Sequence, residues 1–190
     1  MSKRISRAES RAQTRQKLIE AASMLFARTG YASSSVDAIA EAAGFTKGAL
    51  YAHFPTKAAI FLAVFDQMGR NDVEALVTEI RRAKDRPAVE SLLIEWAHMR
   101  SAAGLWPLTI LEFSRLSEKD GASLEDLRAV LRRHWRTLGE AALTRISVDV
   151  DATVFGAALH EIAYAPAMTF VRYPTAADLM TFFLSSLRRR

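Results

Sequence analysis

Two short segments with one apolar face each lie close together near the amino terminus, at residues 35–43 and 47–53. Only three residues separate them, and the first of these is Gly44. A three-residue turn that contains glycine between two helices is typical of a helix-turn-helix. Helices this short are not stable alone in water, so they must share a core with a neighbouring helix. We expect four apolar side chains to form that core: Phe26, Ile39, Leu50 and Phe54.

Polar residues and glycines predict where these helices begin and stop. Ser34, followed three residues later by Asp37, predicts the N-cap of the first short helix. Thr46 predicts the N-cap of the second. Upstream, an apolar stripe predicts a longer helix over residues 14–29, with Gly30 as its stop.

The rest of the chain also has helical periodicity. It predicts a connecting helix over 57–86 and five further helices, at residues 88–103, 105–116, 123–145, 152–171 and 176–187. Five Pro and eight Gly in 190 residues are too few for the many turns of a sandwich or barrel of short strands. We therefore expect an all-α protein: a three-helix helix-turn-helix domain followed by a helical bundle, about nine helices in all.

The excess positive charge is confined to the first third of the chain. Residues 1–57 contain nine Lys or Arg and four Asp or Glu, whereas the remaining 133 residues contain 17 of each. The whole net charge of +5 therefore lies in the segment with the predicted helix-turn-helix. Such an asymmetry favours contact between this segment and a polyanion. We expect a basic arm and DNA-binding domain at residues 1–57 and a second, effector and dimerisation domain at residues 58–190.

The helix predicted over 47–53 is slim enough to enter the major groove of duplex DNA. Three small residues form its outward face: Gly48, Ala49 and Ala52. Ala49 or Ala52 is expected to meet a thymine methyl group, and Lys47 a guanine edge. Phosphates are expected to meet the helix N-terminus and four side chains near it: Thr46, Tyr51, His53 and Lys57.

The segment SSSVDAIAEAAGFTKGALYAHFPTKAAIF resembles the DNA-binding signature of TetR-type transcriptional regulators. A Ser-rich cap, an IA..AG helix, a K-G pair, a Y-x-H-F end and a downstream Lys occur in the same order, and the resemblance extends over about residues 14–65. Phe45 stands where the family more often has a smaller β-branched residue, and Thr46 where it often has Ser. The resemblance implies DNA contacts by Ser34, Ser35, Thr46, Lys47, Gly48, Tyr51, His53 and Lys57.

The resemblance also implies a homodimer through the last two helices, palindromic operator DNA, and a small-molecule effector whose binding changes DNA affinity. Pro166 lies in the helix expected over 152–171 and should kink or end it. The last helix has four large apolar residues, which is more than one side of a monomer usually buries. These candidates for the dimer interface are Leu179, Phe182, Phe183 and Leu187.

Aromatic residues are frequent in the second domain, but no motif there identifies a ligand. Core packing explains such residues by default, and a pocket for a small hydrophobic effector uses the same types. The candidates for effector binding are Trp96, Met99, Arg100, Trp106, Phe113, Trp135, Phe155 and His160. Glu112 is a further candidate for a polar contact inside such a pocket.

Several other classes of site lack their usual residues. No cysteine is present, which excludes disulfides, thiolate metal sites and cysteine nucleophiles. The histidines do not have the spacing of a metal site, and no nucleophile elbow or phosphate-binding glycine loop occurs. We therefore expect no metal, no cofactor and no enzymatic activity. No uncharged apolar run approaches the ~20 residues of a membrane span, so a soluble cytoplasmic protein is expected.

The leading hypothesis is a ligand-responsive transcriptional repressor that binds palindromic operator DNA as a homodimer and is released by a small hydrophobic effector. Two alternatives stay open. In one, the DNA-binding domain is controlled by a protein partner or by dimerisation only. In the other, the chain is a helical small-molecule carrier or enzyme, and the basic motif is incidental.

Overall fold

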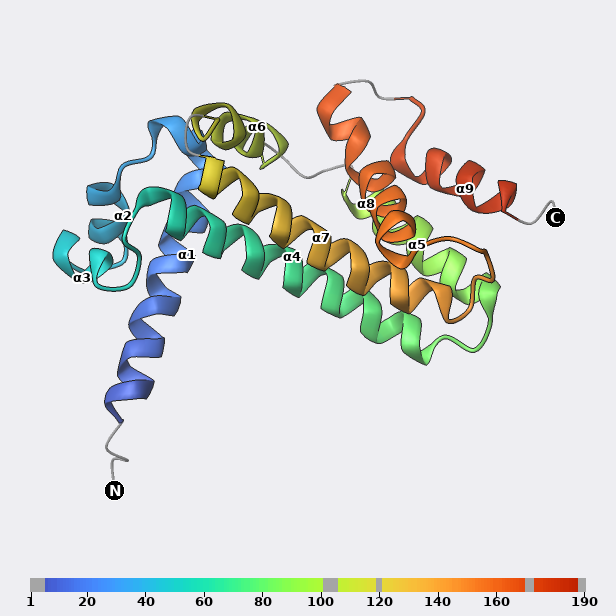
Figure 1. The fold of residues 1–190 in the computed structure, drawn as a ribbon, viewed down its shortest axis with the longest axis horizontal. Helices are drawn as coiled ribbons and strands as arrows, with labels where there is room; N and C mark the ends of the chain where they lie inside the picture. Colours follow the sequence, from blue (N-terminus) through green and yellow to red (C-terminus); the bar gives the residue numbers. More distant parts are fainter. Residues whose placement is uncertain (1–5, 101–105, 119–120, 170–172, 188–190) are drawn as a thin grey trace. The chain divides into compact units, whose positions relative to one another are not determined.

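The computed structural model of the 190-residue chain describes residues 6–100, 106–118, 121–169 and 173–187. These residues form nine α-helices and no strand, which confirms the predicted all-α fold (Figure 1). The helices are α1 (Arg7–Ser33), α2 (Val36–Ala42), α3 (Lys47–Tyr51), α4 (Lys57–Arg82), α5 (Arg86–Arg100), α6 (Trp106–Leu116), α7 (Gly121–Leu143), α8 (Ala152–Thr169) and α9 (Ala176–Ser186). Their order agrees with the predicted order.

Helix α1 begins seven residues earlier than the predicted residue 14, at Arg7. The reason is a capping box in which the Ser6 hydroxyl accepts the Glu9 N–H and the Glu9 carboxylate accepts the Ser6 N–H, at 3.1 and 2.7 Å. The predicted stop at Gly30 is a break within the helix. Gly30 has φ 77° and ψ 177°, a conformation that glycine adopts readily, and helical geometry resumes before Ser34.

The chain divides into two compact units. The first contains the described residues up to Asp66 together with Leu108–Leu124, and the second contains Gln67–Pro107 and the described residues from Glu125 onward. The predicted core of the first unit is confirmed, since all four of its side chains are buried: Phe26, Ile39, Leu50 and Phe54. The boundary expected after residue 57, between a DNA-binding domain and an effector domain, concerns function and stays a prediction.

In the second unit, residues of α4, α5, α7, α8 and α9 share one apolar core. Helices α7 and α8 approach each other backbone to backbone at Gly139 and Gly156. A Cβ on Gly139 would lie 1.8 Å from the carbonyl oxygen of Ala152, and one on Gly156 would lie 1.8 Å from that of Trp135. Only glycine permits this distance, so the pair fixes how closely the two helices pack.

Pro166 does not end α8, which continues to Thr169. Of the two outcomes that the sequence predicts at Pro166, an end of the helix is therefore wrong, and a kink stays a prediction. A proline inside a helix removes one backbone donor, and neighbouring packing can compensate for that loss. Residues 146–151, which join α7 to α8, form no strand.

Candidate functional site

The helix-turn-helix is assembled as the sequence predicts, with one shift of a single residue. Ser35, and not Ser34, caps α2 by accepting the Ala38 N–H at 3.1 Å. Thr46 caps α3 by accepting the Ala49 N–H at 3.2 Å. Gly44, in the turn between the two helices, has φ 74°.

Ser34 does not cap α2, because its side chain is hydrogen-bonded to residues of α1. It is buried, and its hydroxyl donates to the carbonyl oxygen of Gly30 at 2.6 Å. A second contact joins the hydroxyls of Ser34 and Thr29 at 3.0 Å. Ser34 therefore ties the end of α1 to the segment that enters α2, whereas Ser35 is exposed.

Helix α3 exposes a face with little side-chain bulk. Gly48 and Ala52 are exposed and Ala49 is half-buried, while Leu50 on the opposite face is fully buried. Tyr51 is 44% exposed at the end of the helix. The face that the sequence predicts to be nearly bare is therefore open to solvent.

Lys47, the first residue of α3, and Lys57, the first residue of α4, both make contacts within the first unit. Lys47 forms an exposed ion pair with Asp37 of α2 at 2.9 Å, and the hydrogen bond to Asp37 raises the pKa of the lysine. Lys57 donates to the carbonyl oxygen of Ala32 at 3.3 Å, and its ammonium lies 4.3 Å from the centre of the Tyr31 ring. Burial lowers the pKa of Lys57, and the charge of Glu112 opposes this effect.

Two arginines of α1 add positive charge beside His53. Burial, Arg11 and Arg15 together hold the pKa of His53 below its ordinary value. The Arg15 guanidinium also lies 4.9 Å from the centre of the Phe54 ring. Sequence reasoning assigned no contact to Arg15. The available signal was its place four residues after Arg11, on the same face of α1.

Several predicted effector residues gather inside the second unit, around an acid that the sequence analysis missed. Asp72 of α4 accepts the Trp96 indole N–H at 3.0 Å, pairs with Arg100 at 3.0 Å and accepts the Tyr164 hydroxyl at 3.3 Å. His160 stacks on Tyr164 with ring centres 4.6 Å apart. Trp96 and Trp135 lie 6.5 and 6.2 Å from the His160 ring. We name this set the Asp72 cluster: Asp72, Trp96, Arg100, Trp135, His160 and Tyr164.

The Asp72 cluster contains polar groups in an apolar environment. Burial and the neighbouring charge of Asp72 raise the pKa of Tyr164 to about 12. Two buried N–H groups, Nε of Arg100 and Nε1 of Trp135, have no hydrogen-bond acceptor among the described residues. Leaving a buried donor without an acceptor costs about 1–3 kcal/mol. The cluster therefore offers two donors to an added acceptor.

The structure does not bring the remaining effector candidates to this cluster. Phe113 belongs to the core of the first unit, where its ring stacks on Phe61 with centres 4.3 Å apart. Phe155 is buried in the core of the second unit and contacts Phe183. Met99 is 58% exposed, and Trp106 is half-buried at the first turn of α6.

Glu112 likewise lies in the first unit, where its carboxylate accepts the N–H of Ala32 at 3.1 Å. It therefore does not join the Asp72 cluster.

The four dimer candidates on α9 have different surroundings. Phe182 is 75% exposed. Phe183 and Leu187 are partly buried against the core of the second unit, and Leu179 is half-buried. Phe182 is thus the large apolar side chain of this set that the single chain leaves to solvent.

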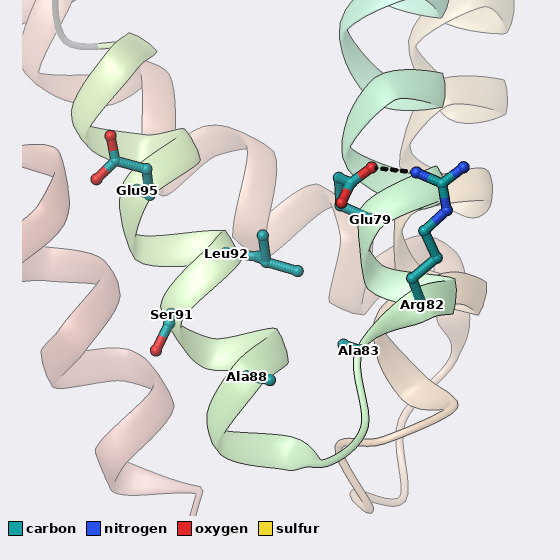
Figure 2. Close-up of a pocket in the computed structure, with 7 residues that line it drawn as sticks. All are labelled: Glu79, Arg82, Ala83, Ala88, Ser91, Leu92 and Glu95. Carbon is teal, nitrogen blue, oxygen red and sulfur yellow. Dashed lines mark hydrogen bonds and ion pairs between the residues drawn. The ribbon is translucent and has the colours of Figure 1, made fainter.

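Two surface hollows occur in the second unit. One, of about 570 Å³, lies between the end of α4 and α5, as Figure 2 shows; it is lined by Glu79, Arg82, Ala83, Ala88, Ser91, Leu92 and Glu95. The other, of about 930 Å³, is lined by Arg86, Pro87, residues 147–150, Ser186 and Leu187. Neither hollow includes a residue of the Asp72 cluster.

The described part of the chain lacks two other kinds of feature. No helix there is both long and apolar enough to cross a membrane. Those residues also contain no group of three or more His, Asp or Glu that could hold a metal ion.

Comparison with known proteins finds similarity concentrated in the first unit. Residues 18–64 match the sequence profile described as bacterial regulatory proteins, tetR family. The HTH-type transcriptional regulator AcrR of Shigella flexneri is 41% identical over 54 residues, which are 28% of this chain and 25% of that protein. The chain thus matches only a quarter of the length of this relative.

Solved structures match almost the whole chain at lower identity. A candidate transcriptional regulator from Streptomyces coelicolor A3(2), SCO7518, has a TM-score of 0.70 at 20% identity, covering 94% of this chain and 99% of that one. The regulator FadR from Bacillus subtilis, solved in complex with stearoyl-CoA, has a TM-score of 0.60 at 18% identity, covering 90% and 96%. At these identities the likeness establishes the fold.

Proposed function

We propose that this chain, which belongs to the tetR family of bacterial regulatory proteins through residues 18–64, is a ligand-responsive transcriptional repressor in the cytoplasm. The observation that carries the proposal is the capped helix-turn-helix, whose α3 presents small exposed residues above a buried Leu50. A narrow helix of this kind lets the backbone approach base edges in the major groove.

The contacts that we propose fall into two groups. Base edges meet Lys47, Gly48, Ala49 and Ala52, and phosphates meet Ser35, Thr46, Tyr51, His53 and Lys57. Ser34 supports these contacts indirectly, through its hydrogen bond to the carbonyl oxygen of Gly30. Lys47 is available to DNA because an exposed ion pair such as the one with Asp37 contributes little free energy to folding.

A homodimer would present two copies of α3 to two half-sites about 34–36 Å apart, and the two-fold symmetry of the dimer would match a palindromic operator. The exposed Phe182 of α9 supports a dimer surface on that helix. A large apolar side chain at this exposure is stabilised when a second copy covers it.

We place the effector site at the Asp72 cluster. The aromatic rings favour an apolar body, and the two N–H donors of Arg100 and Trp135 favour an acceptor oxygen such as a carboxylate or a carbonyl. The FadR structure offers a parallel, because its ligand, stearoyl-CoA, combines an acyl chain with carbonyl groups. The effector lowers operator affinity by the difference between its own affinities for the free and the DNA-bound conformations.

The test is selection of duplex DNA from a randomised library by the full chain, followed by binding measurements on the selected duplex. We expect an inverted repeat. Lys57→Ala should weaken binding and lower the magnitude of the salt slope by about one unit, because one phosphate contact is lost. Lys84→Ala, an equal loss of charge at an exposed position of the second unit, is the matched control and should leave both quantities unchanged. Equal effects of the two variants would argue against the proposed interface.

A further inference from the structure

The break in α1 leaves a backbone N–H that the helix does not satisfy. Gly30 leaves helical geometry, so Ala32, two residues later, cannot donate its N–H within a regular helix. The acceptor comes from 80 residues away, because the Glu112 carboxylate of α6 accepts this N–H at 3.1 Å. A side chain of α6 thus completes the backbone hydrogen bonding of the segment that leads into α2.

The same carboxylate lies directly against Gly30. A Cβ at this position would lie 2.7 Å from one carboxylate oxygen of Glu112 and 3.2 Å from the other. The positive φ favours glycine at residue 30. A larger residue there would also require the end of the Glu112 side chain to shift away from the backbone.

Lys57 of α4 contacts Ala32 at its carbonyl group. Its ammonium donates to the Ala32 carbonyl oxygen at 3.3 Å and lies over the Tyr31 ring. The N–H of Ala32 is thus held by α6 and its C=O by α4. We call these contacts of Glu112 and Lys57 with Ala32 the clasp. Ser35 caps α2 three residues after Ala32, so the clasp determines where the helix-turn-helix begins.

Aromatic packing holds α6 in the position at which Glu112 reaches Ala32. Phe113, next to Glu112, stacks on Phe61 and meets the edge of the Tyr31 ring at 5.1 Å between centres. Thr109, one turn earlier, donates its hydroxyl to the Phe26 carbonyl oxygen at 3.4 Å. A rotation or translation of α6 would therefore withdraw the Glu112 carboxylate from Ala32.

We propose that Glu112 is a positioning residue for DNA binding, and that its contacts with Gly30 and Ala32 fix the entry of α2 and hence the orientation of α3. This inference rests on the proposed function.

The test compares Glu112→Ala, Glu112→Gln and Glu112→Asp with Glu118→Ala, which removes an exposed acid just beyond α6. Gln keeps an acceptor oxygen at the same reach, whereas Asp keeps the charge but is one methylene too short. Hydrogen exchange at the Ala32 amide reports the clasp without DNA. Anisotropy with a duplex selected by the wild-type protein reports its consequence for binding.

We expect Glu112→Ala and Glu112→Asp to speed exchange at Ala32 and to weaken duplex binding by about tenfold, since a hydrogen bond to a charged group is lost. The salt slope should not change, because no phosphate contact is removed. Glu112→Gln should restore affinity to within about threefold, and Glu118→Ala should match the wild type. The short Asp variant retains a carboxylate and so keeps the test open if the Ala variant does not fold.

Two failures are distinguishable. If the wild type selects a duplex and both Glu112→Ala and Glu112→Asp bind it with wild-type affinity, Glu112 is only a stabilising contact and the proposal is overturned. If the wild type itself selects no duplex, the proposed function fails, and the role of Glu112 in DNA binding fails with it.

Discussion

Replacing Gly156 by alanine tests how the α7–α8 crossing supports the second unit. The added Cβ would lie 1.8 Å from the backbone carbonyl oxygen of Trp135, whereas an ordinary contact begins at 3.4 Å. The obstacle is backbone, which cannot rotate away as a side chain can. The two helices must therefore separate by about 1.6 Å at this point.

The magnitude follows from two opposing effects. Overpacking of a close interface costs about 1–3 kcal/mol, and contact with backbone places Gly156→Ala near the upper end of that range. Alanine in place of glycine within a helix returns about 1 kcal/mol. The net loss of unfolding free energy is then about 2 kcal/mol. For a protein of this size, such a loss lowers Tm by about 4–8 °C.

The assay is thermal and denaturant unfolding followed by circular dichroism. Gly121→Ala is the matched control, because no atom of the described residues, its chain neighbours aside, lies within 4 Å of a Cβ at that position. It should leave Tm unchanged or raise it slightly. If Gly156→Ala is as stable as Gly121→Ala, the close backbone approach does not exist in solution and the reasoning is refuted.

Two further predictions concern DNA binding and assembly. Burial, Arg11 and Arg15 lower the pKa of His53 in the free protein, and a nearby phosphate would raise that pKa in the complex. Operator affinity should therefore rise as pH falls through the higher, DNA-bound pKa and level off below the lower, free one; anisotropy at constant ionic strength measures this rise, and His53→Gln should flatten it. Phe182→Ser should weaken the homodimer in sedimentation experiments without lowering monomer stability, because the side chain is 75% exposed. Tyr173→Ser, at 77% exposure, is its control, and an equal effect of both would remove α9 from the dimer surface.

Local signals in the sequence predicted the helix-turn-helix well, because caps and turns act over a few residues. Thr46 caps α3 where predicted, and the breaks at Gly30 and Gly44 have positive φ. The cap of α2 shifted from Ser34 to Ser35 for a reason that residue type cannot supply. Both serines are competent caps, and the choice depends on Ser34 being held by the carbonyl oxygen of Gly30.

The candidate effector site was predicted only in part. Sequence reasoning selected aromatic residues by type, and type does not distinguish a core position such as Phe113 from a residue of the Asp72 cluster. Asp72 and Tyr164 were missed because their partners are distant in sequence. Trp96 reaches Asp72 across 24 residues and Tyr164 reaches it across 92. Such contacts depend on how helices pack and leave no local pattern.

The Asp72 cluster should also make intrinsic tryptophan fluorescence sensitive to ligand binding. Two of the protein's three tryptophans, Trp96 and Trp135, lie 6.5 and 6.2 Å from the same imidazole ring, that of His160. A small molecule entering among these rings would change the polarity around both indoles at once. The intrinsic fluorescence of the unlabelled protein should therefore shift on binding, so a collection of candidate effectors can be screened without a label and without knowledge of the operator.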